Sequence, residues 1–134
     1  MRVVLDVNVL VSALLSKHGA PGRLITLWLE GGFELVVSEE LLAELTRTLA
    51  YPRLRERVTE EDATEFIELL RSTASIVADT EKPPRVSADP GDDYLIALAT
   101  TSASILVSGD RHLLVLAPGL PIHPPVAVLA LLES

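Results

Sequence analysis

Residues 3–11, with the sequence VVLDVNVLV, place one carboxylate inside an apolar run, and this stretch decides the fold. Val3–Leu5 predicts a buried strand, and Asn8 is a candidate N-cap for a helix that runs to about Ser16. Asp6 falls at the end of the predicted strand. A buried carboxylate costs several kcal/mol unless a cation or a set of donors compensates it. Asp6 therefore indicates a functional site.

The same alternation of short apolar runs and helical patterns continues along the chain and is typical of βαβ units. Further strands are expected over 34–37, 75–77, 105–107 and 120–122. Helices are expected over 23–29, from 38 to 50, from 59 to 70, over 92–102 and over 124–132, with 18–22 as a turn. The 134 residues contain no repeat or linker. We expect one domain over 1–134: an α/β/α sandwich around a parallel sheet of about five strands.

The composition limits the chemistry that the chain can perform. It has no cysteine and three scattered histidines, so thiolate and histidine metal sites are excluded and oxygen ligands remain. The net charge of −8 argues against a nucleic-acid binder unless the carboxylates converge on a cation. No apolar run is long enough for a membrane span, and we expect a cytoplasmic protein.

Other acids lie where a sheet edge would gather them. Asp110 follows the apolar run 105–107, although it could equally cap a helix or form a turn. In the pair Asp92-Asp93, Asp92 falls at the third helical position after a candidate N-cap at Asp89, whereas Asp93 enters an apolar helix without such an explanation. The pattern thus favours Asp93. Glu44 lies on the shoulder of an apolar helix stripe, and by itself it is an ordinary surface glutamate.

Clustered carboxylates repel one another unless a cation lies between them. Parallel strands end at one edge of a sheet, so acids at different strand ends can meet there. Hard oxygen ligands suit Mg²⁺ or Mn²⁺, which can activate water and stabilise charge on a phosphate.

Four segments together resemble a known family. LDVNVLVSA (5–13) is similar to the opening motif of PIN domains, and SEELLAEL (38–45), DYLIALA (93–99) and VSGD (107–110) are similar to their later acidic motifs. Their order agrees over essentially the whole chain. The resemblance implies a PIN-like sandwich and a Mg²⁺- or Mn²⁺-dependent ribonuclease that cleaves single-stranded RNA. VapC-type members are toxins, commonly homodimers, that are paired with an antitoxin protein.

The resemblance also implies roles for individual residues. By position, the catalytic, metal-binding acids would be Asp6, Glu44, Asp93 and Asp110, with Asp92 left open as a ligand and with Asn8, Ser12 and Ser108 as supporting residues. Candidate phosphate contacts are Arg53, Arg55, Arg57 and Arg111, although a solvated helix end or surface turn fits these arginines equally well.

Two other functions stay open. The chain could be a nuclease-inactive PIN-like module that binds a partner. It could also be a phosphotransfer domain, either a haloacid-dehalogenase-like phosphatase or a response-regulator receiver. The first needs a second aspartate two residues after the nucleophile, where this chain has Asn8, and the second needs a lysine after a late strand, which this chain lacks.

Overall fold

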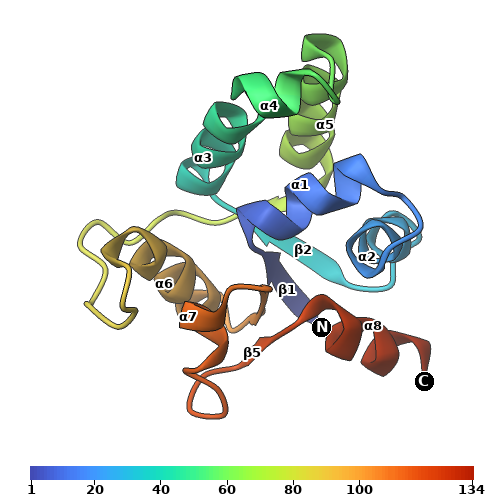
Figure 1. The fold of residues 1–134 in the computed structure, drawn as a ribbon. Helices are drawn as coiled ribbons and strands as arrows, with labels where there is room; N and C mark the ends of the chain where they lie inside the picture. Colours follow the sequence, from blue (N-terminus) through green and yellow to red (C-terminus); the bar gives the residue numbers. More distant parts are fainter.

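The computed structural model describes residues 1–134 and contains one sheet of five parallel strands, in the order β3-β2-β1-β4-β5 (Figure 1). The strands are β1 (Arg2–Leu5), β2 (Glu34–Val37), β3 (Ser75–Ile76), β4 (Ile105–Val107) and β5 (Ile122–His123). The predicted fold class is confirmed.

Helices flank the sheet, and none of them is long and apolar enough to span a membrane (Figure 1). They are α1 (Val7–Leu15), α2 (Ala20–Leu29), α3 (Glu39–Leu49), α4 (Pro52–Arg55), α5 (Glu60–Thr73), α6 (Asp93–Thr101), α7 (Arg111–Leu114) and α8 (Pro125–Glu133), with the 3₁₀ turn η1 (Pro90–Asp92) before α6.

Strand β1 is the central strand, and its apolar residues are fully buried. Val3 is paired with Leu35 of β2 on one side and with Ile105 of β4 on the other. A parallel strand that is covered on both faces must be apolar throughout, which explains the unbroken run Val3–Leu5.

The order of the strands produces a crevice at the carboxyl edge of the sheet. The chain proceeds from β1 outward to β2 and β3, and then crosses to the opposite side of β1 to form β4 and β5. The connections that leave β1 and β4 therefore diverge. In open parallel sheets this switch point is where ligands bind, and Asp6 and Asp110 follow these two strands.

The structure corrects two expectations about the first helices. Asn8 is not an N-cap, because α1 already begins at Val7 and Asp6 holds the capping position without a side-chain capping bond. The predicted turn over 18–22 is partly helical, since α2 begins at Ala20 with proline in its first turn. There Gly22 packs so closely that an added Cβ would lie 2.5 Å from the carbonyl oxygen of Lys17.

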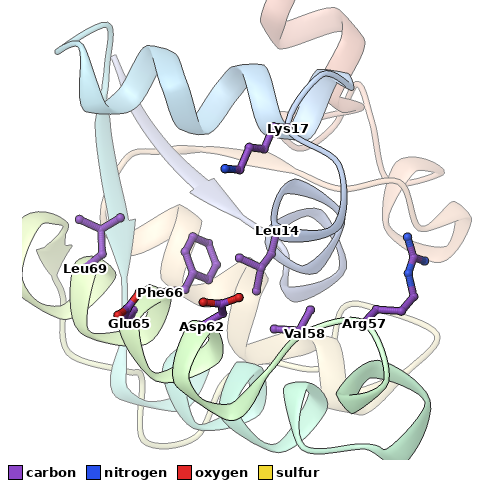
Figure 2. A pocket seen from close by; sticks show the side chains of 8 residues that line it. All are labelled: Leu14, Lys17, Arg57, Val58, Asp62, Glu65, Phe66 and Leu69. Atoms are coloured by element: carbon purple, nitrogen blue, oxygen red, sulfur yellow. The ribbon is translucent and has the colours of Figure 1, made fainter.

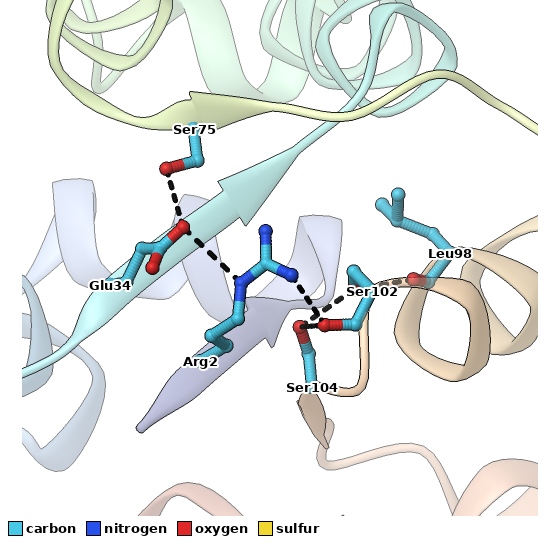
Figure 3. Close-up of polar contacts among 6 residues, drawn as sticks. All are labelled: Arg2, Glu34, Ser75, Leu98, Ser102 and Ser104. Carbon is cyan, nitrogen blue, oxygen red and sulfur yellow. Dashed lines mark hydrogen bonds and ion pairs between the residues drawn. The ribbon is translucent and has the colours of Figure 1, made fainter.

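Arg2 links three segments at the amino edge of the sheet. Its Nε pairs with Glu34 Oε2 on β2 at 3.2 Å, and its Nη1 donates to the carbonyl oxygen of Ser102 at 2.7 Å (Figure 3). Glu34 also accepts a hydrogen bond from Ser75 on β3. One guanidinium thus connects β1 and β2 with the turn that leads into β4.

We expect Arg2→Met, which keeps the apolar part of the side chain, to lower the free energy of unfolding by about 1–2 kcal/mol, because the Ser102 carbonyl loses a charged donor. Urea denaturation measures this change. The matched variant Arg23→Met removes an exposed ion pair with Glu133 and should cost less than about 1 kcal/mol. An equal loss of unfolding free energy in both variants would contradict the view that Arg2 links β1 and β2 to the turn before β4.

Candidate functional site

Ser108 joins the ends of β1 and β4 around Asp6. The Ser108 hydroxyl donates to Asp6 Oδ2 at 2.7 Å and accepts from the Asp110 amide at 3.0 Å. Both Asp6 and Ser108 are buried. Burial raises the pKa of Asp6, the Ser108 hydroxyl lowers it, and the charge of Glu44 raises it again. The charges of Asp6 and Glu44 therefore interact.

Asp110 combines the two roles that the sequence left open. Its Oδ1 accepts from the His112 amide at 2.8 Å and so caps α7, and the His112 ring nitrogen Nδ1 lies 3.8 Å from the same oxygen. The carboxylate is only partly exposed, and its charge contributes to the raised pKa of Asp92. A capping residue can thus also belong to the acidic cluster.

The Asp93 carboxylate accepts hydrogen bonds from the loop that precedes it. Its side chain is 2% exposed, and Oδ1 accepts from the amides of Ser87 at 2.8 Å and Val86 at 3.1 Å. Arg85 Nε lies 3.4 Å from Oδ2. The Ser87 amide is the main cause of a pKa below the ordinary value, with further lowering by Val86 and Arg85. This carboxylate anchors the loop to the start of α6.

Asp92 is the member of the pair that faces the other acids. Burial, followed by the charges of Asp6, Asp89, Asp110 and Glu44, raises its pKa to about 6. Its Oδ2 is buried and has no hydrogen-bond partner. It makes no capping bond either, although Asp89 caps η1 as expected. Asp93 Oδ2 is likewise buried without a hydrogen-bond partner, so the preference for Asp93 over Asp92 as the metal ligand stays a prediction.

Glu44 projects from α3 and is held by Tyr94 of α6. The Tyr94 hydroxyl donates to Glu44 Oε2. Burial, and then this hydrogen bond and the surrounding negative charge, raise the pKa of Tyr94 well above its ordinary value. The sequence analysis missed Tyr94, although it lies directly after the acid pair and its type of side chain can donate to a carboxylate.

The acids are not arranged as a finished metal cage: no group of three or more His, Asp or Glu side chains has the geometry to hold an ion. Their chemistry nevertheless fits a divalent cation. Only oxygen donors are present, the charge is in excess, and Asp92 Oδ2 is a buried oxygen without a partner. Which residues bind a metal stays a prediction, with Asp6, Glu44, Asp93 and Asp110 as the predicted set and Asp92 as a further candidate whose buried oxygen lacks a partner.

The supporting polar residues differ from one another in their surroundings. Ser108 is fully buried in the site, whereas Asn8 and Ser12 are exposed on one face of α1. Their predicted supporting role stays a prediction.

The arginines that were expected to bind RNA lie in separate places. Arg53 and Arg111 are exposed, and Arg55 is half-buried in a cavity between α3 and α5. Arg57 borders a groove beside α1. None of the four lines the cavity next to the acids.

The cavity that does adjoin the acids has a volume of about 360 Å³, and we call it the α3 groove. It is lined by Glu40, Glu44, Arg47, Thr48, Tyr51, Asp89, Gly91, Asp92 and Tyr94. The sequence analysis missed Arg47 and Tyr51. For Arg47 the available signal was helical spacing, because positions 44, 47 and 48 share one face of α3, whereas Tyr51 lies beyond the end of this helix.

Two isosteric changes should shift stability in opposite directions. Without divalent ions at pH 7.5, Asp92→Asn should raise the melting temperature by a few degrees, because it removes an unpartnered buried charge. Asp93→Asn should lower it by a few degrees, because the amides of Val86 and Ser87 lose a charged acceptor. Scanning calorimetry measures both.

The pH dependence follows from the raised pKa of Asp92. Between about pH 4 and pH 6 the folded state binds a proton that the unfolded state has released, so stability falls as the pH rises through this window. The advantage of Asp92→Asn should therefore be absent near pH 4 and complete above about pH 7. An advantage that does not vary with pH would contradict the assignment.

Comparison with known proteins agrees with this geometry. The sequence profile of the PIN domain matches residues 2–112. An uncharacterized protein of Methanocaldococcus jannaschii is 29% identical over 114 residues, which cover 85% of this chain and 74% of that protein.

Solved structures show the same fold at low identity. PAE2754 from Pyrobaculum aerophilum has a TM-score of 0.68 at 18% identity, over 99% of this chain and 90% of that chain. VapBC2 from Rickettsia felis, in a structure bound to a DNA fragment from the VapBC2 promoter, has a TM-score of 0.64 at 17% identity. The match covers 91% of this chain and 97% of that chain. VapBC-1 from nontypeable Haemophilus influenzae has a TM-score of 0.63 at 15% identity, over 94% and 99%. With the profile match over most of its length, the chain belongs to the PIN domain family.

Proposed function

We propose that this protein is a metal-dependent endoribonuclease that cleaves single-stranded RNA. The observation that carries the proposal is the buried Asp92 Oδ2, which has no hydrogen-bond partner. The pKa of its carboxyl group is raised by burial and by the charges of Asp6, Asp89, Asp110 and Glu44. Membership of a family whose proteins are typically metal-dependent nucleases supports it.

Asp6, Glu44, Asp92 and Asp110 would hold Mg²⁺ or Mn²⁺. When bound, the cation supplies Lewis acidity and neutralises the charge that develops on the phosphate. The protein's own contribution is to fix the oxygens. Ser108 orients Asp6, the Tyr94 hydroxyl orients Glu44, and the His112 amide holds Asp110.

The reaction in this proposal is hydrolysis of a phosphodiester. A water oxygen forms a bond to phosphorus while the bond to the leaving ribose oxygen breaks, in line with the attack. Asp93 has a positioning role, because it anchors residues 86 and 87 beside the start of α6 and so fixes the direction in which Asp92 projects.

The direct test is cleavage of an unstructured RNA labelled with a fluorophore, in the presence of Mn²⁺. Wild type should cut it, and Asp92→Asn should lower the rate by about 100-fold or more, because the site loses a charged ligand. Glu30→Gln, which removes an exposed carboxylate elsewhere, should retain the wild-type rate. If wild type cuts no single-stranded RNA, the nuclease-inactive interaction module becomes the better account.

A protein partner is a second part of the proposal, since structural relatives are VapBC complexes. A groove of about 340 Å³ lies between the end of α1 and the start of α5 (Figure 2). Its apolar part consists of Leu14, Val58, Phe66 and Leu69, and its charged border consists of Lys17, Arg57, Asp62 and Glu65. We propose that an antitoxin segment packs there, with apolar side chains in the groove and an acidic flank beside Lys17. The expected homodimer stays a prediction.

The growth of a bacterial host that expresses this protein, with and without the antitoxin, tests the proposed partner. Induced expression should slow the growth of a bacterial host, and co-expression of the neighbouring reading frame should restore it. Lys17→Glu should stay toxic but resist neutralisation, because the mutation repels acidic flanks. Arg23→Glu is the matched charge reversal on another surface and should be neutralised as wild type is. Equal neutralisation of both variants would exclude the groove as the docking site.

A further inference from the structure

The α3 groove continues the acidic site along one face of α3. Glu40, Glu44, Arg47 and Thr48 follow one another at helical spacing, and Tyr51 comes next where α3 ends. From Glu44 to Thr48 the helix rises by about 6 Å. The opposite wall is formed by the segment that carries Asp92. The groove therefore leads directly away from the acid cluster.

Arg47 and Tyr51 make no side-chain hydrogen bond within the protein. Arg47 is exposed, and its nearest carboxylate oxygen, on Glu40, is 4.0 Å away. Tyr51 is 56% exposed, so its ring is accessible to a ligand. Its backbone carbonyl accepts from the amides of Leu54 and Arg55, which fixes the residue at the junction with α4 while its ring stays free.

We propose that the α3 groove binds the nucleotide next to the scissile phosphate, with its base stacked on Tyr51 and its phosphate on Arg47. This inference rests on the proposed function, because it places the reacting phosphate at the acid cluster. Stacking on an aromatic ring requires a base that is not paired, so this subsite selects single strands. It also makes recognition tolerant of sequence, because every base has a π-face.

The other charged residues of the groove determine where an RNA strand can lie. Glu40 and Asp89 also line the groove, and their carboxylates repel phosphates. Arg47 is the one cationic side chain of the lining and is therefore the favoured position for a phosphate of the RNA. This arrangement explains how a chain with a net charge of −8 can bind RNA without a basic surface.

Binding can be measured separately from cleavage in an Asp110→Asn background, which is silenced but leaves the groove intact. The probe is an unstructured RNA of ten nucleotides with a terminal fluorophore, followed by anisotropy in Mn²⁺. Tyr51→Ala should weaken binding about tenfold, whereas Tyr51→Phe, which keeps the ring, should bind as the background does. Arg47→Ala should reduce the slope of log K against log salt by about one. Arg23→Ala should change neither quantity.

The same changes in the otherwise wild-type protein should raise KM for cleavage and leave kcat nearly unchanged. Unaltered RNA binding by Tyr51→Ala, or equal losses in Tyr51→Ala and Tyr51→Phe, would overturn the stacking subsite even if cleavage is observed. Binding that depends on Tyr51 in a protein that never cleaves would support the subsite and refute the nuclease. A background protein that binds no RNA would refute the subsite.

Discussion

Repulsion among carboxylates at the carboxyl edge of the sheet is the constraint on which the rest of this structure depends. The fold places Asp6 and Asp110 after neighbouring strands, and α3 and η1 bring Glu44 and Asp92 to the same edge. Burial and mutual charge raise the pKa values of Asp6 and Asp92. Without a cation, such an arrangement opposes folding. A cation that bound only the folded state would offset this repulsion.

The surrounding structure is organised to hold these charges in place. Ser108 uses its hydroxyl twice, as a donor to Asp6 and as an acceptor from the Asp110 amide, so one buried side chain couples the ends of β1 and β4. The Tyr94 hydroxyl donates to Glu44 and so links α6 to α3. Successive residues at the start of a helix point about 100° apart. This rotation explains why Asp92 reaches the cluster and Asp93 anchors a loop.

Much of this fold could be predicted from the sequence, because the decisive signals are local. The apolar run Val3–Leu5 and the N-caps Ser38 and Thr59 identify buried strands and helix starts without any knowledge of tertiary structure. Asp6 could be singled out for the same reason. The start of α2 could not, since the close approach of Gly22 to the end of α1 depends on packing between two helices.

The choice between Asp92 and Asp93 needed information that a single sequence lacks. A capping pattern gave Asp92 an ordinary explanation, but its side chain makes no capping bond, and the amides that occupy Asp93 come from a loop without regular secondary structure. The groove residues Arg47 and Tyr51 were missed because α3 was examined for its apolar stripe. Their significance appears only when the opposite wall of the groove is in place.

The central claim is that the four acids share a divalent cation, and thermal stability against Mn²⁺ concentration tests it most directly. A cation that binds only the folded state at a hundred times its Kd stabilises it by about 2.7 kcal/mol. The account predicts a saturable rise in the melting temperature of wild type that is lost in Asp92→Asn. An equal rise in both proteins, or no rise in either, would contradict it.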